Sequence, residues 1–413
     1  MLLTFSEYFI KIALQTRIHL SFFIYLPNLR QEREFLPHPF VSELLMNPIG
    51  LYLHIPFCDG KCAYCNFFSR RADNDRLNEY TERLIACIAD WGRKIDRTVD
   101  TVYFGGGTPS LLGHDRLIAV LEGVYRSFTV SAHAEITVEV NPSSTDDLDF
   151  AALRQAGFNR LSIGLQSAND NELEILGRRH SVDDARRTVR RAQAAGFDNI
   201  SLDVMLAIPE QTVNSLDKTL EFCASCHVQH ISAYILKVEE GTKFYQLKDK
   251  LPLFTDDEQA AFYEHTVEKL SKLGYPQYEI SNFAQKGCES RHNLHYWHDD
   301  EYLGLGPSAH SFLDGKRFYY DSDFQCFYDG HICDESDGGD SDEYIMLALR
   351  LTEGLRFAEY ERRFHQPVSD RLIKSARNLQ SQGLCEVSDT SVSLTVKGFL
   401  VSNAVIAYLL ENS

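Results

Sequence analysis

The stretch LYLHIPFCDGKCAYC, residues 51–65, decides the fold, because it joins an apolar run to a loop with three cysteines within eight residues. Three thiolates can hold three irons of a cubane and leave the fourth iron open for another ligand. Thiolates also suit zinc. Structural zinc normally takes four protein ligands, and only His54 lies nearby as a fourth. The loop therefore predicts a [4Fe–4S] cluster on Cys58, Cys62 and Cys65, with a zinc site as the alternative.

Short apolar runs alternate with helical stretches from residue 50 to about residue 240. This alternation is typical of βαβ units and a parallel sheet. Six such units can close partly into a TIM-like barrel, whose site lies at the carboxyl ends of the strands. We therefore expect an α/β fold with a partial (βα)6 barrel, in which Cys58, Gly105–Thr108 and Asn141 follow the first three strands. The expected strands are Leu51–Ile55, Thr101–Phe104, Glu135–Val140, Arg160–Leu165, Asn199–Met205 and Gln229–Leu236.

The pattern changes after residue 240. Residues 256–273 are expected to be helical, aromatic segments without clear periodicity follow them, and the acidic residues 321–341 are expected to form a surface loop. Helices around a short hairpin at 384–394, with one final helix over 396–410, indicate an α+β, winged-helix-like domain. The expected parts are an N-terminal extension over 1–45, the barrel over 46–240, an aromatic-rich extension over 241–340 and the C-terminal domain over 341–413.

Charge and cysteine usage limit the class of protein. The 413 residues carry a formal net charge of −18, which argues against nucleic acid as a partner, because phosphate binding needs a basic stripe. Three of the ten cysteines are crowded and the others are scattered, which indicates metal binding in a reducing compartment and predicts a cytoplasmic protein.

The N-terminal residues 1–45 contain an apolar patch at Ile18–Leu26. They lack the run of about 20 apolar residues that a membrane-spanning helix needs, and they lack the apolar core and cleavage site of a signal peptide. We expect a dispensable extension, with an amphipathic surface helix as the alternative. At most peripheral membrane association is expected.

The C-x3-C-x2-C spacing, with the aromatic Tyr64 before the last cysteine, resembles the signature of the radical S-adenosylmethionine superfamily. The resemblance implies that the open iron of the cluster binds S-adenosylmethionine. The glycine-rich turn Gly105–Pro109 agrees with it, because backbone without side chains can approach a ligand closely. Alone the turn is weak evidence, since it lacks a dinucleotide or P-loop pattern and an ordinary strand-to-helix turn explains it equally.

Further motifs resemble the HemW family of haem chaperones and the related HemN family of oxygen-independent coproporphyrinogen III oxidases. They include YFGGGTPS at 103–110, RLSIGLQS at 160–167 and GLGPSAHS at 304–311, and the resemblance extends from about Ile49 to the C-terminus. It implies three cofactors: a [4Fe–4S] cluster, S-adenosylmethionine and haem. The implied S-adenosylmethionine contacts are Tyr52, Tyr64, Gly106, Gly107, Thr108, Glu139, Gln166, Arg178 and Asp203.

The chemistry of three of these contacts suits the ligand. Glu139 can accept from the methionine ammonium, Asp203 can accept from ribose hydroxyls, and Arg178 can pair with a carboxylate in bidentate geometry that lysine could not copy. The alternative for each polar residue is an ordinary hydrogen bond at a strand end or a helix cap.

Two departures separate the chain from the oxidase branch. The oxidase motif has a further cysteine two residues after the third cluster ligand, where this chain has Phe67. The oxidases also carry an N-terminal segment similar to R-Y-T-S-Y-P, and residues 1–50 contain nothing like it. Both departures favour a haem chaperone that passes haem to an acceptor protein and takes an electron from a donor. The alternative is an oxygen-independent coproporphyrinogen III oxidase, and no catalytic residue is assigned.

The segment RHNLHYW at 291–297 matches the H-N-x-x-Y motif that the HemW family associates with haem, so the resemblance implies His292 as the haem ligand. Neutral imidazole is a good axial ligand for haem iron. His295 and His298 are nearby alternatives and His310 is a candidate on the cofactor side, while a structural histidine in an aromatic segment remains the simpler explanation. The C-x-x-C-H pattern at 223–227 spells a c-type haem attachment site, but we reject it because no export signal accompanies it.

Overall fold

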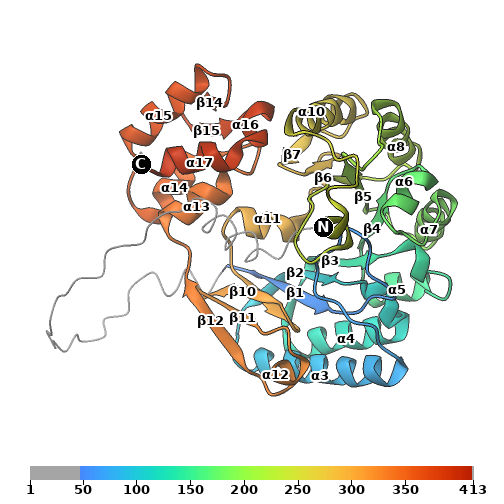
Figure 1. Ribbon diagram of the computed structural model, residues 1–413. Coiled ribbons are helices and arrows are strands. Elements are labelled where there is room, and N and C mark those ends of the chain that lie inside the picture. The colour runs from blue at the N-terminus through green and yellow to red at the C-terminus, as the bar shows by residue number, and fades with distance from the viewer. Residues whose placement is uncertain (1–46, 412–413) are drawn as a thin grey trace, which may run out of the picture.

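The computed structural model describes residues 47–411, so the expectations for residues 1–45 lie outside the described residues. The core is a twelve-stranded sheet in the order β12-β11-β10-β9-β1-β2-β3-β4-β5-β6-β8-β7, in which β1 to β6 are parallel neighbours in chain order. All six predicted strands are present (Figure 1). The strands are β1 (Ile49–Ile55), β2 (Thr98–Gly106), β3 (Thr129–Val140), β4 (Arg160–Gln166), β5 (Ile200–Leu206) and β6 (His230–Ile235).

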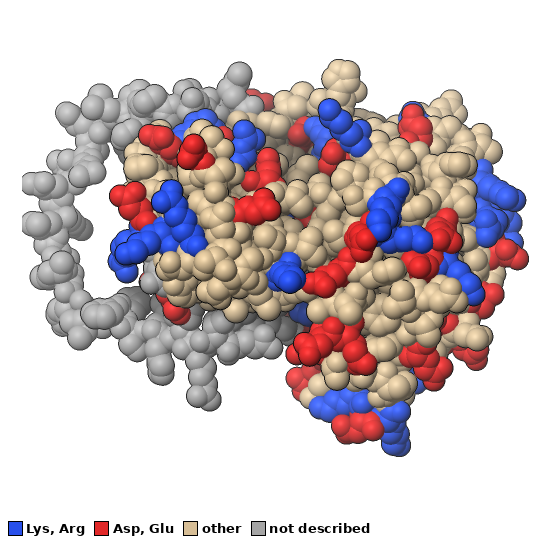
Figure 2. Space-filling model, turned by 90° about the horizontal axis from the view of Figure 1, so that it is seen from above, with Lys and Arg blue, Asp and Glu red and all other residues tan. Residues whose placement is uncertain are grey.

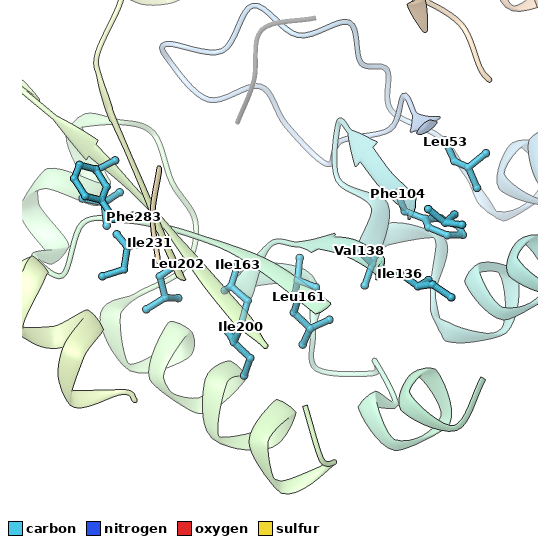
Figure 3. Packing of buried hydrophobic residues seen from close by; sticks show 14 of the residues in the cluster. Leu53, Phe104, Ile136, Val138, Leu161, Ile163, Ile200, Leu202, Ile231 and Phe283 are labelled. Carbon is cyan, nitrogen blue, oxygen red and sulfur yellow. The ribbon is translucent and has the colours of Figure 1, made fainter. Parts of the chain in front are cut away.

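The parallel strands are apolar because helices cover one face and the barrel interior lies on the other. All seven residues of β5, ISLDVML, are buried, as expected for a parallel strand covered on both faces. Figure 3 shows side chains from successive strands in a continuous row, among them Leu53, Phe104, Leu161 and Ile231. Each such buried side chain contributes about 1.5–3 kcal/mol relative to an exposed one.

Amphipathic helices connect the parallel strands and cover the outside of the barrel (Figure 1). Their starts are encoded locally: Asp73 accepts from the Arg76 amide at the first helix, and Ser181 and Asp184 form a reciprocal capping box at another. Such caps contribute about 1 kcal/mol each. The helices are α3 (Asn74–Gly92), α4 (His114–Ser127), α5 (Phe150–Ala156), α6 (Asp170–Ile175), α7 (Val182–Ala194) and α8 (Val213–Ser225).

The region after residue 240 extends both sides of the parallel sheet. Strand β9 (Tyr302–Leu305) pairs in parallel with β1, and β8 (Asn282–Ala284) pairs antiparallel with β6. In the described part of the chain the end strands β12 and β7 do not pair with each other, so the barrel is partial, as predicted. The remaining elements are α9 (Lys243–Leu247), α10 (Asp256–Lys272), β7 (Gln277–Glu279), α11 (Arg291–Trp297), β10 (His310–Leu313) and β11 (Lys316–Tyr320).

The prediction of a surface loop over 321–341 is wrong. This segment contains α12 (Phe324–Tyr328) and the edge strand β12 (Ile332–Asp337), which pairs antiparallel with β11. The acidic composition hid the strand, because one side of an edge strand faces water and tolerates charge. Its alternation of half-buried and exposed positions is visible only after the pairing with β11 is known.

The C-terminal residues form a smaller lobe beside the barrel, coloured orange to red in Figure 1. Helices surround a three-stranded antiparallel sheet in the order β13-β15-β14, which is the predicted α+β, winged-helix-like arrangement. The expected single helix over 396–410 is interrupted at Val401, next to which the buried Arg350 guanidinium donates to Ser402 and Asn403. The elements are α13 (Ser341–Ala348), β13 (Leu355–Arg356), α14 (Phe357–Phe364), α15 (Asp370–Gln380), β14 (Cys385–Val387), β15 (Ser391–Leu394), α16 (Val396–Leu400) and α17 (Ser402–Glu411).

Basic and acidic side chains are interspersed on the face drawn in Figure 2. The described residues visible there form no continuous basic stripe. Among residues 47–411, no helix has the length and apolar character needed to cross a membrane.

Candidate functional site

The cysteine loop lies at the carboxyl end of β1 and faces the ends of the neighbouring strands. The Cys58 Sγ and Thr108 Oγ1 atoms share a hydrogen bond of 3.2 Å. The Arg178 Nη1 atom donates to Cys62 Sγ at 3.7 Å. The loop is also fixed through its backbone, since the Ala63 amide donates to the Leu176 carbonyl at 3.0 Å. The structure therefore brings Thr108 to Cys58 and Arg178 to Cys62.

The three thiols are close enough to influence one another, and they are partly shielded from water. Burial raises the pKa of Cys58 and raises the pKa of Cys65 to about 11, and the neighbouring thiols add to both shifts. A ligand cation would therefore favour the thiolate forms of Cys58 and Cys65.

The number of thiols in the loop distinguishes the two metal alternatives. A structural zinc site takes four protein ligands, whereas a cubane with one open iron takes one thiolate at each of three irons. The three thiols of Cys58, Cys62 and Cys65 therefore fit an iron–sulfur cluster better than zinc.

The glycine-rich turn follows β2 and approaches the cysteine loop at backbone distance. A Cβ atom on Gly107 would lie 2.6 Å from the Phe57 carbonyl oxygen, so no side chain fits there. Gly106 has a φ of +111°, which favours glycine. Its amide donates to Glu139 Oε2 at 3.2 Å. The turn thus presents bare backbone beside the cluster loop and holds the Glu139 carboxylate.

Glu139 occupies a shielded position at the end of β3. Its Oε1 atom accepts from the Tyr103 hydroxyl at 3.0 Å. Burial raises the pKa of Glu139 to about 7, and the nearby Asp203 carboxylate adds to the shift. A ligand ammonium at this position would stabilise the ionised form, because an adjacent opposite charge lowers a carboxyl pKa.

Arg178 connects the cysteine loop to the ends of β3 and β4. Its Nη2 atom donates to the Gly164 carbonyl at 2.8 Å and to Asn141 Oδ1 at 3.0 Å. The planar guanidinium can span three partners because its donors form a rigid fork. The sequence placed Asn141 at the active edge but did not identify its contact with Arg178.

The other predicted cofactor contacts lie at neighbouring strand ends. Asp203 on β5 accepts from the Ser162 hydroxyl at 2.9 Å, and Gln166 at the end of β4 accepts from Tyr234. Sequence patterns did not single out Ser162 or Tyr234, although polar side chains at the ends of buried strands are a usable signal. The two predicted tyrosine contacts are Tyr52 and Tyr64. Tyr52 shares a hydrogen bond of 2.9 Å with His54 Nδ1, and Tyr64 is buried in the cysteine loop.

A polar cavity of about 250 Å³ adjoins the cysteine loop. Cys62, Thr108, Asn141 and Arg178 line it together with further basic side chains. Its cationic lining suits a carboxylate-bearing ligand, because a guanidinium binds carboxylate in two parallel hydrogen bonds.

His292 lies inside the barrel, with its ring centroid 5.2 Å from that of Tyr103 and 6.3 Å from that of Tyr52. Its helix α11 covers the amino-terminal halves of β1 and β2, and the His292 side chain is 1% exposed. The Nδ1 atom shares a hydrogen bond of 2.8 Å with Thr101 Oγ1, and Nε2 shares one of 2.9 Å with Tyr296. Burial lowers the pKa of His292 well below its ordinary value. The ring is therefore neutral, and both of its nitrogens are engaged within the protein.

The alternative histidines, in contrast to His292, have acidic partners. His295 contacts Asp100 at 2.8 Å, His298 contacts Glu353 at 3.0 Å, and His310 contacts Glu335 at 3.3 Å. At the C-x-x-C-H pattern, the Cys223 and Cys226 side chains are buried at the end of α8.

Two protein-family models match the chain. The Radical SAM superfamily matches residues 52–223, and the HemN C-terminal domain matches residues 342–401. The first match contains the end of β1, the cysteine loop and β2 to β5, and the second lies in the C-terminal lobe.

Curated relatives match over nearly the whole chain. The heme chaperone HemW of Bacillus subtilis (strain 168) is 33% identical over 375 residues, which cover 87% of this chain and 98% of the relative. HemW of Mycobacterium tuberculosis (strain CDC 1551 / Oshkosh) is 33% identical over 397 residues, covering 90% of this chain and 97% of the relative. Among solved structures, coproporphyrinogen III oxidase (HemN) from Escherichia coli aligns with a TM-score of 0.75 at 21% identity, covering 91% of this chain and 93% of that one. The structural likeness shows the fold alone.

Proposed function

The chain belongs to the HemW family of the radical SAM superfamily, and from this premise we propose that it is a haem chaperone. It would carry a [4Fe–4S] cluster, bind S-adenosylmethionine and haem, and pass haem to an acceptor protein. The observation that carries the proposal is the match to HemW relatives over 98% of the Bacillus subtilis protein. Phe67, in place of the extra cysteine that the oxidase motif carries, agrees with it.

The cluster would be held by Cys58, Cys62 and Cys65. When bound, it supplies an open iron and an electron that the thiolates alone cannot provide. The contact between Arg178 and Cys62 supports this assignment, because it places a positive charge beside a side chain that would bind the cluster. An electron donor is then required as a partner.

S-adenosylmethionine would lie between the cysteine loop and the strand ends. Glu139 would accept from its ammonium, Arg178 would bind its carboxylate, and Asp203 would accept from its ribose hydroxyls. The backbone of Gly106 and Gly107 would approach the methionine part. Tyr52, Tyr64, Thr108 and Gln166 would complete the contacts.

His292 is the family-matched candidate for the haem iron. The hydrogen bonds to Thr101 and Tyr296 mean that α11 must shift before the ring can reach an iron. Iron ligation by His292 is thus coupled to a movement of this helix. The His292 ring is already neutral, as ligation requires, because only unprotonated imidazole ligates a metal.

One anaerobic preparation tests the proposed function against the oxidase alternative. Reconstituted protein is incubated with haem, and a second portion with coproporphyrinogen III, reductant and S-adenosylmethionine. We expect a saturable change in the Soret band, transfer of haem to apomyoglobin as a surrogate acceptor, and no release of CO2. Release of CO2 without haem binding would contradict the chaperone function and support the oxidase alternative.

A further inference from the structure

A second and larger cavity, of about 550 Å³, opens between the barrel and the C-terminal lobe. Tyr64 and Phe67 of the cysteine loop form one wall, β6 forms another, and α13 with the α16–α17 junction closes the side of the lobe. The cavity therefore adjoins the cluster loop but lies apart from the polar cavity lined by Cys62 and Arg178. Its size falls within the range of sites for small organic ligands, about 300–1,000 Å³.

Most of the exposed wall of this cavity is apolar. The apolar lining includes Phe67, Met205, Leu236, Trp297, Met346 and Leu347. Aromatic and thioether side chains make favourable contacts with the face of a flat, polarisable ring system. This lining would hold a large planar ligand and would exclude a strongly hydrated one.

Two buried ionisable groups interrupt the apolar wall. The Arg350 side chain is 3% exposed, and its guanidinium donates to Ser402 Oγ and Asn403 Oδ1, each at 2.6 Å. Glu279 is 0% exposed, and its Oε1 atom has no hydrogen-bond partner among the described residues. A buried carboxyl oxygen without a partner costs free energy, so a ligand group that reached Glu279 from the cavity would gain a hydrogen bond there.

We propose that this cavity binds the macrocycle of a tetrapyrrole, with Phe67 and Trp297 against its apolar part and Arg350 paired with one of its carboxylates. The inference rests on the proposed function and adds the location of the bound haem. A haem in this cavity would contact both lobes and would lie directly beside the cluster loop.

Glu279 completes the recognition. Burial raises its pKa to about 7, so near neutral pH a large part of the population carries a carboxylic acid that can donate. The acid can donate to a propionate oxygen while Arg350 neutralises the charge. The ligand class is therefore a planar apolar ring with carboxylates at one edge, which both haem and metal-free porphyrins satisfy.

His292 does not line this cavity, although it belongs to α11, the helix that contributes Trp297 to the lining. Trp297, at the end of α11, lines the cavity, whereas His292 lies inside the barrel. The contacts to the macrocycle are therefore independent of His292, so binding should survive its loss, and ligation of the iron by His292 would need the shift of α11 described above. Haem and protoporphyrin IX are compared as probes, because only haem offers an iron for ligation.

The test introduces a large side chain at an exposed residue of the cavity lining. Ala404 is an exposed residue of α17 that lines the cavity, and Tyr408 is exposed on the same helix outside the cavity lining. Haemin and protoporphyrin IX are titrated into the reconstituted full chain, with porphyrin absorbance as the readout. We expect Ala404→Trp to weaken binding of both by about tenfold or more and Tyr408→Trp to bind both like the wild type. Equal binding by Ala404→Trp and the wild type would overturn the cavity assignment but leave the chaperone function standing. If the wild type binds neither probe, the proposed function itself fails.

A second variant keeps the inference falsifiable if Ala404→Trp does not fold. Arg350→Gln is titrated with haemin and with its dimethyl ester, which has no free carboxylate. We expect about tenfold weaker binding of haemin and unchanged binding of the ester, because a charge-assisted hydrogen bond is lost only for haemin. Equal effects on both ligands, or no effect on either, would contradict the role of Arg350.

Discussion

Arg178 lies beside Cys62, with its Nη1 atom 3.7 Å from the sulfur. The same side chain donates to the carboxyl end of β4 through the Gly164 carbonyl. One guanidinium therefore connects the cluster loop to the barrel and faces the polar cavity. Arg178 therefore both lines the proposed S-adenosylmethionine site and supports Cys62, a proposed cluster ligand.

Replacing Arg178 tests this double role. Arg178→Lys keeps the charge but cannot span Gly164, Asn141 and a ligand carboxylate at once. We expect about tenfold weaker binding of S-adenosylmethionine to the cluster-loaded protein, measured by equilibrium dialysis. Arg187→Lys, at an exposed arginine of α7 that does not line the polar cavity, serves as the matched control and should bind almost normally. Equal losses in the two variants would remove the special role of Arg178.

The raised pKa of Glu139 predicts that binding of S-adenosylmethionine depends on pH. Its pKa of about 7 means that the protein without ligand must lose a proton before the carboxylate can meet an ammonium. Affinity for S-adenosylmethionine should therefore rise as the pH increases from about 6 to about 8. Glu139→Gln should bind more weakly at the upper pH and should lose most of this dependence. A dependence that persists in the variant would assign it to another group.

The three loop cysteines should be individually necessary for the cluster. Each loop thiolate would be the only protein ligand of its iron, so Cys58→Ala, Cys62→Ala and Cys65→Ala should each lose the iron–sulfur absorbance and most of the iron after reconstitution. Cys326→Ala changes a free cysteine in α12 and should keep both. Tightly bound zinc in the wild type at the expense of iron would contradict the cluster.

His292 predicts a stability effect that depends on pH. His292→Gln should lower the free energy of unfolding by about 2 kcal/mol near pH 7.5, because it disturbs two buried hydrogen bonds and the packing around them. The folded protein holds His292 neutral with a lowered pKa, whereas in the unfolded chain the ring takes a proton below about pH 6.5. The contribution of His292 is therefore fully present above that pH and is lost as the pH falls.

The difference between wild type and His292→Gln should accordingly shrink by up to about 1.4 kcal/mol per pH unit below about pH 6.5. Urea denaturation at several pH values measures it. A difference that is constant from about pH 7.5 to about pH 5.5 would show that the ring is not held neutral.

The sequence predicted the barrel well because its signals are local. Apolar runs such as ISLDVML at 200–206 have the length and composition of buried strands, and the functional motifs follow directly after such runs. Strand ends of a parallel sheet meet at one edge, so Cys58, Thr108 and Asn141 could be expected together. Arg178 lies beyond α6, and only the family resemblance pointed to it.

Contacts between residues far apart in the sequence could not be predicted from such local signals. The acidic edge strand β12 depends on pairing with β11, and the pattern of its own residues resembles a loop. The position of His292 inside the barrel depends on contacts with Thr101, which is 191 residues away along the chain. The large cavity likewise needs Phe67, β6 and the C-terminal lobe to be placed together before it exists.

The most direct measurement is a haemin titration of the anaerobically reconstituted full chain, followed at the Soret band. A chaperone of this family should give a saturable shift with one haem per chain, and the bound haem should pass to apomyoglobin. A Soret band that stays that of free haemin throughout the titration would contradict the proposed function.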